Sequence, residues 1–134
     1  MPSPVERFIA AIGYPERAPV GATSFSVLVD GGEVLVRAEP GRLFFSRALA
    51  CGREDLPRLA SFVPGRMLRE EAVLAADPGP DGAAFLWRDL PDDASAGAMQ
   101  RAFESFCDSC DWWLDRISEF SAPAPEIPPL MIRP

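Results

Sequence analysis

The sequence predicts an α+β domain in which helices pack on one antiparallel sheet, in the order helix, three strands, helix, two strands, helix. Three observations support this fold class: apolar strand segments joined by tight turns, a helix-capping pattern near the N-terminus, and a long amphipathic segment near the C-terminus. A chain of 134 residues has the size of one domain with one core. We therefore expect a single domain over residues 1–120, followed by a Pro-rich tail over residues 121–134.

The first half of the chain indicates one short helix and three strands. In SPVERFIAAIG, Ser3 and Glu6 have the spacing of a capping box, and Pro4 suits the first helical position. The segments TSFSVLV and EVLVRAE flank an Asp-Gly-Gly turn at residues 30–32, and RLFFSRALA follows a Pro-Gly turn. Strands with such short links pair as an antiparallel meander.

The second half of the chain indicates a helix, a hairpin and a long final helix. The second helix opens at Asp55-Leu56-Pro57 and is interrupted or ended by Pro64-Gly65, and RMLREE indicates a further helical turn after it. AVLAA and AAFLWR flank the polar turn DPGPDG, which predicts a second hairpin. The final helix runs from about Ala94 to Phe120, capped by Asp92-Asp93, with one apolar face formed by Met99, Phe103, Phe106, Cys110, Trp113, Ile117 and Phe120.

The charge and the amino-acid composition exclude several classes of function. A net charge of −7 repels phosphate backbones and anionic headgroups, so neither nucleic acid nor a membrane is an expected partner. The chain contains no His, which removes imidazole bases and His metal ligands. The N-terminus also lacks the pattern of a secretory signal, and we expect a cytoplasmic protein.

The pair Cys107 and Cys110 in FCDSC resembles a redox or metal motif, but its position argues against either role. Reactive thiols of such motifs lie at a helix N-terminus, whereas this pair is in the middle of the final helix among acidic neighbours. Cys51 would add only a third zinc ligand. We therefore expect both cysteines of the pair to pack in or beside the core, with no metal, no cofactor and no catalytic residue in this chain.

The stretches VLAADPGPDGAAFLWRDLP and MQRAFESFCDSCDWWLDRI carry a likeness to a known family. This sequence and that family share one order of features: an apolar strand ending in Asp, a Gly-rich turn, a strand ending in Leu-Pro, and a final helix with aromatic residues. The residues at these places are Leu74-Ala75-Ala76-Asp77, Gly79, Gly82, Leu90-Pro91, Phe103, Phe106 and Trp113. Over about residues 3–120 the sequence resembles the class I chaperones of bacterial type III secretion systems, the Tir-chaperone-like family.

The resemblance implies a function without catalysis. Such a protein is a homodimer that binds the N-terminal segment of one or a few secreted effectors and keeps it extended, soluble and ready for the export ATPase. The likeness places an effector groove around the first helix and first hairpin, with contacts from Val5, Phe8, Ile9, Phe25, Val27 and Leu35. It places the dimer contact on the second helix and fourth strand, with Leu59, Phe62, Val63, Met67 and Leu74. For each of these residues the alternative is a place in the core of one chain.

Two features depart from the family, and two other functions stay open. The first helix is shorter than usual, and the Pro-rich tail is extra; either could change which partner is held. One alternative is an adaptor or regulator of the same fold that sequesters a cytoplasmic protein of the secretion pathway. The other is a small-molecule-binding protein or thiol-dependent enzyme that uses Cys51, Cys107 or Cys110.

Overall fold

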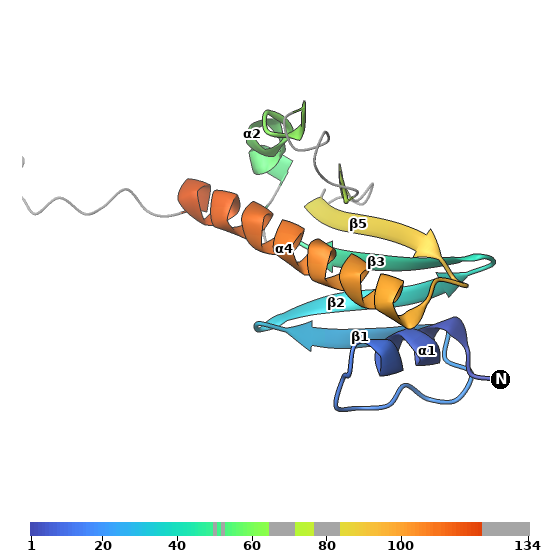
Figure 1. Cartoon of the computed structure of the whole chain (residues 1–134). Coiled ribbons are helices and arrows are strands. Elements are labelled where there is room, and N and C mark those ends of the chain that lie inside the picture. Colours follow the sequence, from blue (N-terminus) through green and yellow to red (C-terminus); the bar gives the residue numbers. More distant parts are fainter. Residues whose placement is uncertain (50, 52, 65–71, 77–83, 122–134) are drawn as a thin grey trace, which may run out of the picture.

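The computed structural model describes residues 1–49, 51, 53–64, 72–76 and 84–121 (Figure 1). Its elements are α1 (Pro4–Ala11), β1 (Ser24–Val29), β2 (Gly32–Glu39), β3 (Arg42–Ala48), the 3₁₀ turn η1 (Arg53–Asp55), α2 (Leu56–Ala60), β4 (Val73–Ala76), β5 (Ala84–Pro91) and α4 (Ala96–Ser121). The strands form one antiparallel sheet in the order β1-β2-β3-β5-β4. This arrangement confirms the predicted α+β fold and its element order.

The two hairpins join through β3 and β5, so that β1 and β4 are the edges of the sheet. At the β1–β2 turn, Asp30 and Gly31 have φ values of 49° and 78°. Two residues with positive φ form the turn that matches the twist of a two-residue hairpin, as the Asp-Gly sequence predicts. The predicted turn DPGPDG and the predicted helical turn RMLREE lie outside the described part of the chain, as does the tail from residue 122.

Helix α1 starts with the predicted capping box. The Ser3 hydroxyl accepts the N–H of Glu6 at 3.2 Å, and the Ser3 N–H donates to Glu6 Oε2 at 2.6 Å. The same Glu6 oxygen accepts the N–H of Gly21 at 3.1 Å, which ties the following loop to the helix start. The capping box therefore fixes both α1 and the entry into β1.

Replacing Glu6 by Gln should lower the melting temperature at neutral pH but not in acid. Hydrogen bonds from the backbone N–H groups of Ser3 and then Gly21 lower the pKa of the Glu6 carboxyl from its ordinary value of 4.5. A group with a lowered pKa stabilises the fold above its ordinary pKa and loses that contribution as the pH falls through the lowered pKa. The Tm values of the parent chain and Glu6→Gln should differ at about pH 7, and the difference should disappear as the pH falls through the lowered pKa. A difference that is the same at all pH values would contradict this origin.

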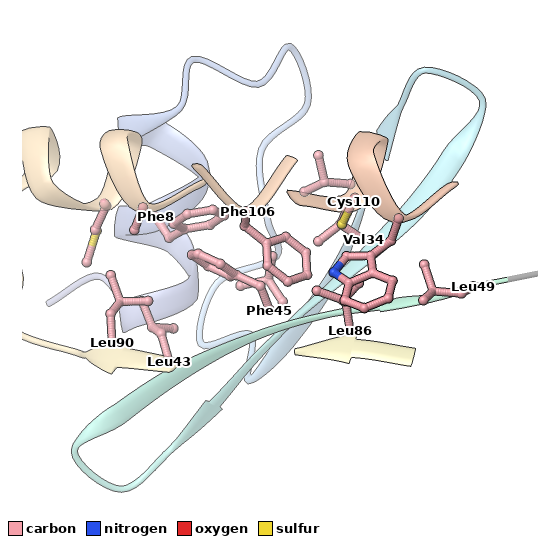
Figure 2. Close-up of a cluster of buried hydrophobic side chains, with 14 of the residues drawn as sticks. Phe8, Val34, Leu43, Phe45, Leu49, Leu86, Leu90, Phe106 and Cys110 are labelled. Carbon is pink, nitrogen blue, oxygen red and sulfur yellow. The ribbon is translucent and has the colours of Figure 1, made fainter. Parts of the chain in front are cut away.

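The hydrophobic core lies between the sheet and the helices α1 and α4 (Figure 2). The Phe8 and Phe45 rings have centroids 4.7 Å apart, and the Phe45 and Phe106 rings 5.8 Å apart, so that one aromatic cluster joins α1, β3 and α4. Aliphatic side chains from the strands, Val34, Leu43 and Leu86 among them, complete the packing. Both helices therefore cover the same face of the sheet (Figure 1).

The long helix α4 confirms the predicted apolar face from Met99 to Ile117 and corrects its cap; the Phe120 side chain lies outside the described part of the structure. The buried side chains on it are Met99, Ala102, Phe106, Ser109, Cys110, Trp113 and Ile117. The prediction that Asp92 and Asp93 cap this helix is wrong. The helix begins at Ala96, and the Ser95 hydroxyl accepts the N–H of Ala98 at 3.1 Å. A short turn after β5 separates the two aspartates from the helix. None of the described helices is long and apolar enough to cross a membrane.

Candidate functional site

The face of the sheet opposite α1 and α4 is covered by none of the described helices (Figure 1). We call it the open face. Alternation along the strands places one set of side chains in the core and the other set on this face. Leu28, Leu35 and Val73 on it are 67%, 39% and 39% exposed. Exposed apolar side chains gathered on one sheet face are typical of an interaction surface.

A hollow of about 380 Å³ lies in the middle of the open face. The strand register builds it, because Leu35 pairs with Ser46 and Ser46 with Trp87, while Arg37 pairs with Phe44 in the next row. The complete lining is Leu35, Arg37, Phe44, Ser46, Phe85 and Trp87. A concave site with aromatic walls and a few polar groups suits an apolar side chain of a partner.

Charged side chains form the rim of the hollow and orient its aromatic walls. The Arg37 guanidinium lies 5.5 Å from the centre of the Phe44 ring and 3.3 Å from a Glu39 carboxylate oxygen. The Phe44 and Trp87 rings lie 6.1 Å apart and are tilted by 45°. Because these charged groups are exposed, they contribute little to stability and are available to orient a partner.

The edge strand β1 borders the open face and exposes part of its backbone. Val29 and Gly32 close the two-residue turn, so alternate residues from Val29 backwards hydrogen-bond to β2. The bond from the Ala38 N–H to the Thr23 carbonyl follows this alternation. The backbone groups of the intervening residues, Ser24, Ser26 and Leu28, therefore point outward, where an added strand would pair with them.

The structure places most of the residues predicted to contact an effector in the core. Val5, Phe8, Ile9 and Val27 are at most 2% exposed and pack between α1 and the sheet. A direct contact of these four with a partner would require the core to open. Phe25 is half-buried on β1 and Leu35 lines the hollow, and for these two the prediction stays a prediction.

The residues predicted to form a dimer contact lie around α2 and β4. Leu59 is fully buried, whereas Phe62, Val63 and Leu74 are half-buried against the core. Helix α2 ends at Ala60, earlier than the sequence predicts, so Phe62 and Val63 follow it. Phe62 instead packs edge-on against Trp112 and Trp113 of α4, with ring centroids 5.7 and 6.5 Å apart. Met67 lies outside the described residues.

The thiols are placed for packing and not for reaction. Cys110 is fully buried, and Cys107 and Cys51 are half-buried. Burial raises the pKa of Cys107 to about 11, with a further rise from the carboxylate of Asp111, and raises that of Cys110 to about 12. Burial also raises the pKa of Cys51. Among the residues that the structure describes, no group of three or more Cys, Asp or Glu side chains is arranged to hold a metal ion.

Alkylation should therefore be slow in the folded protein. Thiolate is the reactive form, and pKa values of about 11 and 12 at Cys107 and Cys110 leave little of it at neutral pH. Iodoacetamide at about pH 8, followed by intact-mass spectrometry, should modify these two residues many times faster in denaturant than in buffer. Equal rates in both conditions would show that the thiols are accessible and would reopen the thiol-enzyme interpretation.

Sequence reasoning missed the other large apolar residues of this surface, namely Leu28, Phe44, Val73, Phe85 and Trp87. The signal was present in LFF and FLW, where large apolar residues occupy consecutive positions and so must point to both faces of a strand. The sequence did not show which face the helices cover. Of the six residues predicted to contact an effector, Leu35 lines the hollow.

Comparisons with known proteins agree with this fold. No family model and no curated protein matches the sequence. A chain of the HopA1–SchA chaperone–effector complex superposes with a TM-score of 0.63 at 14% identity, covering 82% of this chain and 89% of that one. A chain of the complex of the Yersinia pestis type III secretion chaperone SycH with a fragment of YscM2 superposes with a TM-score of 0.57 at 18% identity. The match covers 82% of this chain and 96% of that one. The chain has the fold of type III secretion chaperones.

One neighbour of a different description has the same fold. YbjN from E. coli, described as a putative transcription regulator, superposes with a TM-score of 0.58 at 10% identity, covering 87% of this chain and 90% of that one. The fold is thus shared by proteins with different described roles. Because fold alone does not define function, the function has to be argued from the open face and the β1 edge.

Proposed function

We propose that this protein is a cytoplasmic chaperone that binds the N-terminal segment of a type III secreted effector and keeps it soluble and competent for export, without catalysis. The observation that carries the proposal is the open face, an apolar sheet surface with an aromatic hollow beside an edge strand. The fold shared with chains of chaperone–effector complexes supports it. The raised pKa values of the half-buried Cys107 and the buried Cys110 favour binding over thiol chemistry.

The open face fits an extended segment with a bulky apolar residue. The Phe44 and Trp87 rings and the Leu35 side chain would receive that residue in the hollow. Strand pairing along β1 would supply main-chain hydrogen bonds that depend little on the partner's sequence, and the hollow would supply selection. A chaperone that serves an unfolded segment needs both properties, because the segment offers backbone groups and scattered apolar side chains.

The charged side chains at the rim of the hollow would favour one orientation of a bound partner. Arg42 pairs with Asp89 at 2.7 Å and Arg37 with Glu39 at 3.3 Å, so that opposite charges alternate across the strands beside the hollow. A partner with charges of fitting sign and spacing would be favoured over one that places like charges there. Selection among effectors would then depend on the residues that flank the apolar anchor.

We also propose that the protein is a homodimer and that the dimer delivers its cargo to the export ATPase. The region of α2 and the edge strand β4 is the proposed contact, where Phe62, Val63 and Leu74 are half-buried and Val73 is partly exposed. Light scattering after size exclusion should give twice the chain mass of 14.6 kDa. A mass of one chain at every concentration would contradict the dimer.

A second function, an adaptor or regulator of the same fold, keeps support from one observation. YbjN has this fold and is described as a putative transcription regulator. Such a protein would use the same open face, but its partner would stay in the cytoplasm. The two functions therefore differ in the fate of the partner and not in the binding surface.

Affinity purification of the tagged full chain from its native cells, grown under secretion-inducing conditions, tests the proposal. The expected result is a bound protein that also appears in the culture medium and whose N-terminal region alone is sufficient for binding. The matched control is the tagged Phe44→Ala variant, which lacks one wall of the hollow and should recover much less of it. Recovery of partners that stay in the cytoplasm would overturn the chaperone in favour of the regulator.

A further inference from the structure

Tyr14 occupies the outward edge of β1 at one point. It follows Gly13, whose φ of 70° turns the chain away from the end of α1. The Tyr14 hydroxyl accepts the backbone N–H of Leu28 at 3.2 Å, and its ring packs edge-on against Phe25 with centroids 6.0 Å apart. The N–H of Leu28 is one of the outward-pointing groups to which an added strand would bind. The hydroxyl oxygen therefore takes the place of a backbone carbonyl oxygen.

The loop that carries Tyr14, residues 13–21, has glycines with positive φ at both ends. Gly13 and Gly21 have φ values of 70° and 72°, and a side chain at either position would meet nothing within 4 Å. Residues that can take unusual φ values at the two ends of a segment are suited to absorb a change in its direction. The two glycines are thus in positions to act as hinges.

Most residues of this loop are exposed, and only Tyr14 and Ala18 are half-buried against the core. A hollow of about 370 Å³ separates part of the loop from α1, and Val20 is 96% exposed. The far end of the loop is tied by the N–H of Gly21, which donates to Glu6 at 3.1 Å. The near end is tied by Tyr14, whose N–H donates to the Ile9 carbonyl at 3.3 Å and whose hydroxyl accepts the N–H of Leu28 at 3.2 Å. A segment with few buried apolar contacts opens at a lower cost in free energy than the core does.

We propose that Tyr14 competes with the partner for the β1 edge. When a partner strand pairs with β1, its carbonyl oxygen replaces the Tyr14 hydroxyl on the Leu28 N–H, and the loop over residues 13–21 moves away about Gly13 and Gly21. In the free protein, Tyr14 covers an edge that could otherwise pair with a second chain. This inference rests on the proposed function, because it assigns a regulatory contact to the same binding surface.

The first test uses the free full chain and needs no partner. Tyr14→Phe removes the hydroxyl and keeps the ring that packs on Phe25. The Leu28 amide should exchange with deuterium about two- to tenfold faster in this variant, as expected from the loss of one hydrogen bond, with the Ser26 amide as the unchanged internal reference. Ser118→Ala, which removes an exposed hydroxyl on α4 that donates to the Asp115 carbonyl, is the control for the loss of a hydroxyl away from β1. An unchanged Leu28 amide would overturn the inference.

The second test adds the effector segment recovered in the purification described above. Tyr14 is the single tyrosine of the chain, so incorporation of 3-fluorotyrosine gives one ¹⁹F resonance. Saturation with the segment should move this resonance toward the position of a solvent-exposed tyrosine, and Tyr14→Phe should bind the segment about two- to tenfold more tightly. Binding with an unmoved resonance and equal affinity would overturn the competition and leave the chaperone function standing. A chain that binds no segment would overturn both.

Discussion

Phe45→Ala should destabilise the protein more than any other single truncation in the sheet. The Phe45 side chain is fully buried and contacts the rings of Phe8, Phe103 and Phe106 at centroid distances of 4.7, 5.7 and 5.8 Å. Removal of a buried phenylalanine ring costs about 3–5 kcal/mol, because the core loses both apolar burial and packing. That is a large part of the stability of a domain of this size. We expect thermal unfolding to shift down by more than about 10 °C.

Phe44→Ala is the matched control, since the same chemical change is made one residue earlier on the same strand. The Phe44 ring lies on the open face, where it is half-buried beside Arg37 and Trp87. Its removal should cost about 1 kcal/mol or less of stability. Equal losses of stability from the two variants, measured by urea unfolding, would contradict the assignment of the two faces.

The same Phe44→Ala variant should lose most of its partner binding. If the hollow is the anchor site, this variant lacks one of the three aromatic side chains that line it, and removal of such an anchor typically costs about 2 kcal/mol or more of binding free energy. We therefore expect the Kd for the effector segment, measured by calorimetry, to rise about 30-fold or more. Phe45→Ala, studied below its unfolding temperature, should change the Kd far less than it changes stability.

Pro2→Ser provides the control for loss of exposed apolar surface in general. Pro2 is exposed at the start of the chain and lies outside both the hollow and the loop over residues 13–21. Its Kd should stay within about twofold of the parent value. A Phe44→Ala variant that binds as well as Pro2→Ser would show that the hollow is not the binding site.

The elements of this fold follow from local signals in the sequence. Ser3, Pro4 and Glu6 predict the start of α1 because capping depends on residues only three positions apart, and the structure contains the same capping box. The Asp-Gly turn predicts the first hairpin because few residues adopt two successive positive φ values. The seam of α4 was predicted because a helix repeats its face every three or four residues.

The binding surface depends on tertiary structure and was predicted only in part. Val5, Phe8 and Ile9 form the apolar face of α1, which fits a groove and a core equally well until the position of α4 is known. In LFF, the sequence shows that Phe44 and Phe45 point to opposite faces without showing which face the helices cover. The choice is made by contacts between residues far apart in the chain, such as Phe45 with Phe8 and Phe106.

Trp87 is a residue of the proposed binding site that the sequence alone did not predict. The sequence directs attention to the adjacent Trp112 and Trp113, which pack with Phe62 near the end of α4. Trp87 stands alone in FLWRD, and it joins Leu35 and Phe44 only through the pairing of β3 with β5 and of β2 with β3. The strand order that brings them together is set by how the two hairpins meet.

Fluorine NMR of the full chain labelled with 5-fluorotryptophan tests the central claim most directly. The chain contains three tryptophans, Trp87 on the open face and Trp112 and Trp113 on α4, and a Trp87→Phe variant assigns the resonance of the first. Saturation with the N-terminal segment of the secreted partner should shift the Trp87 resonance and leave that of the buried Trp113 in place. A bound segment that leaves the Trp87 resonance unmoved would contradict binding at the open face.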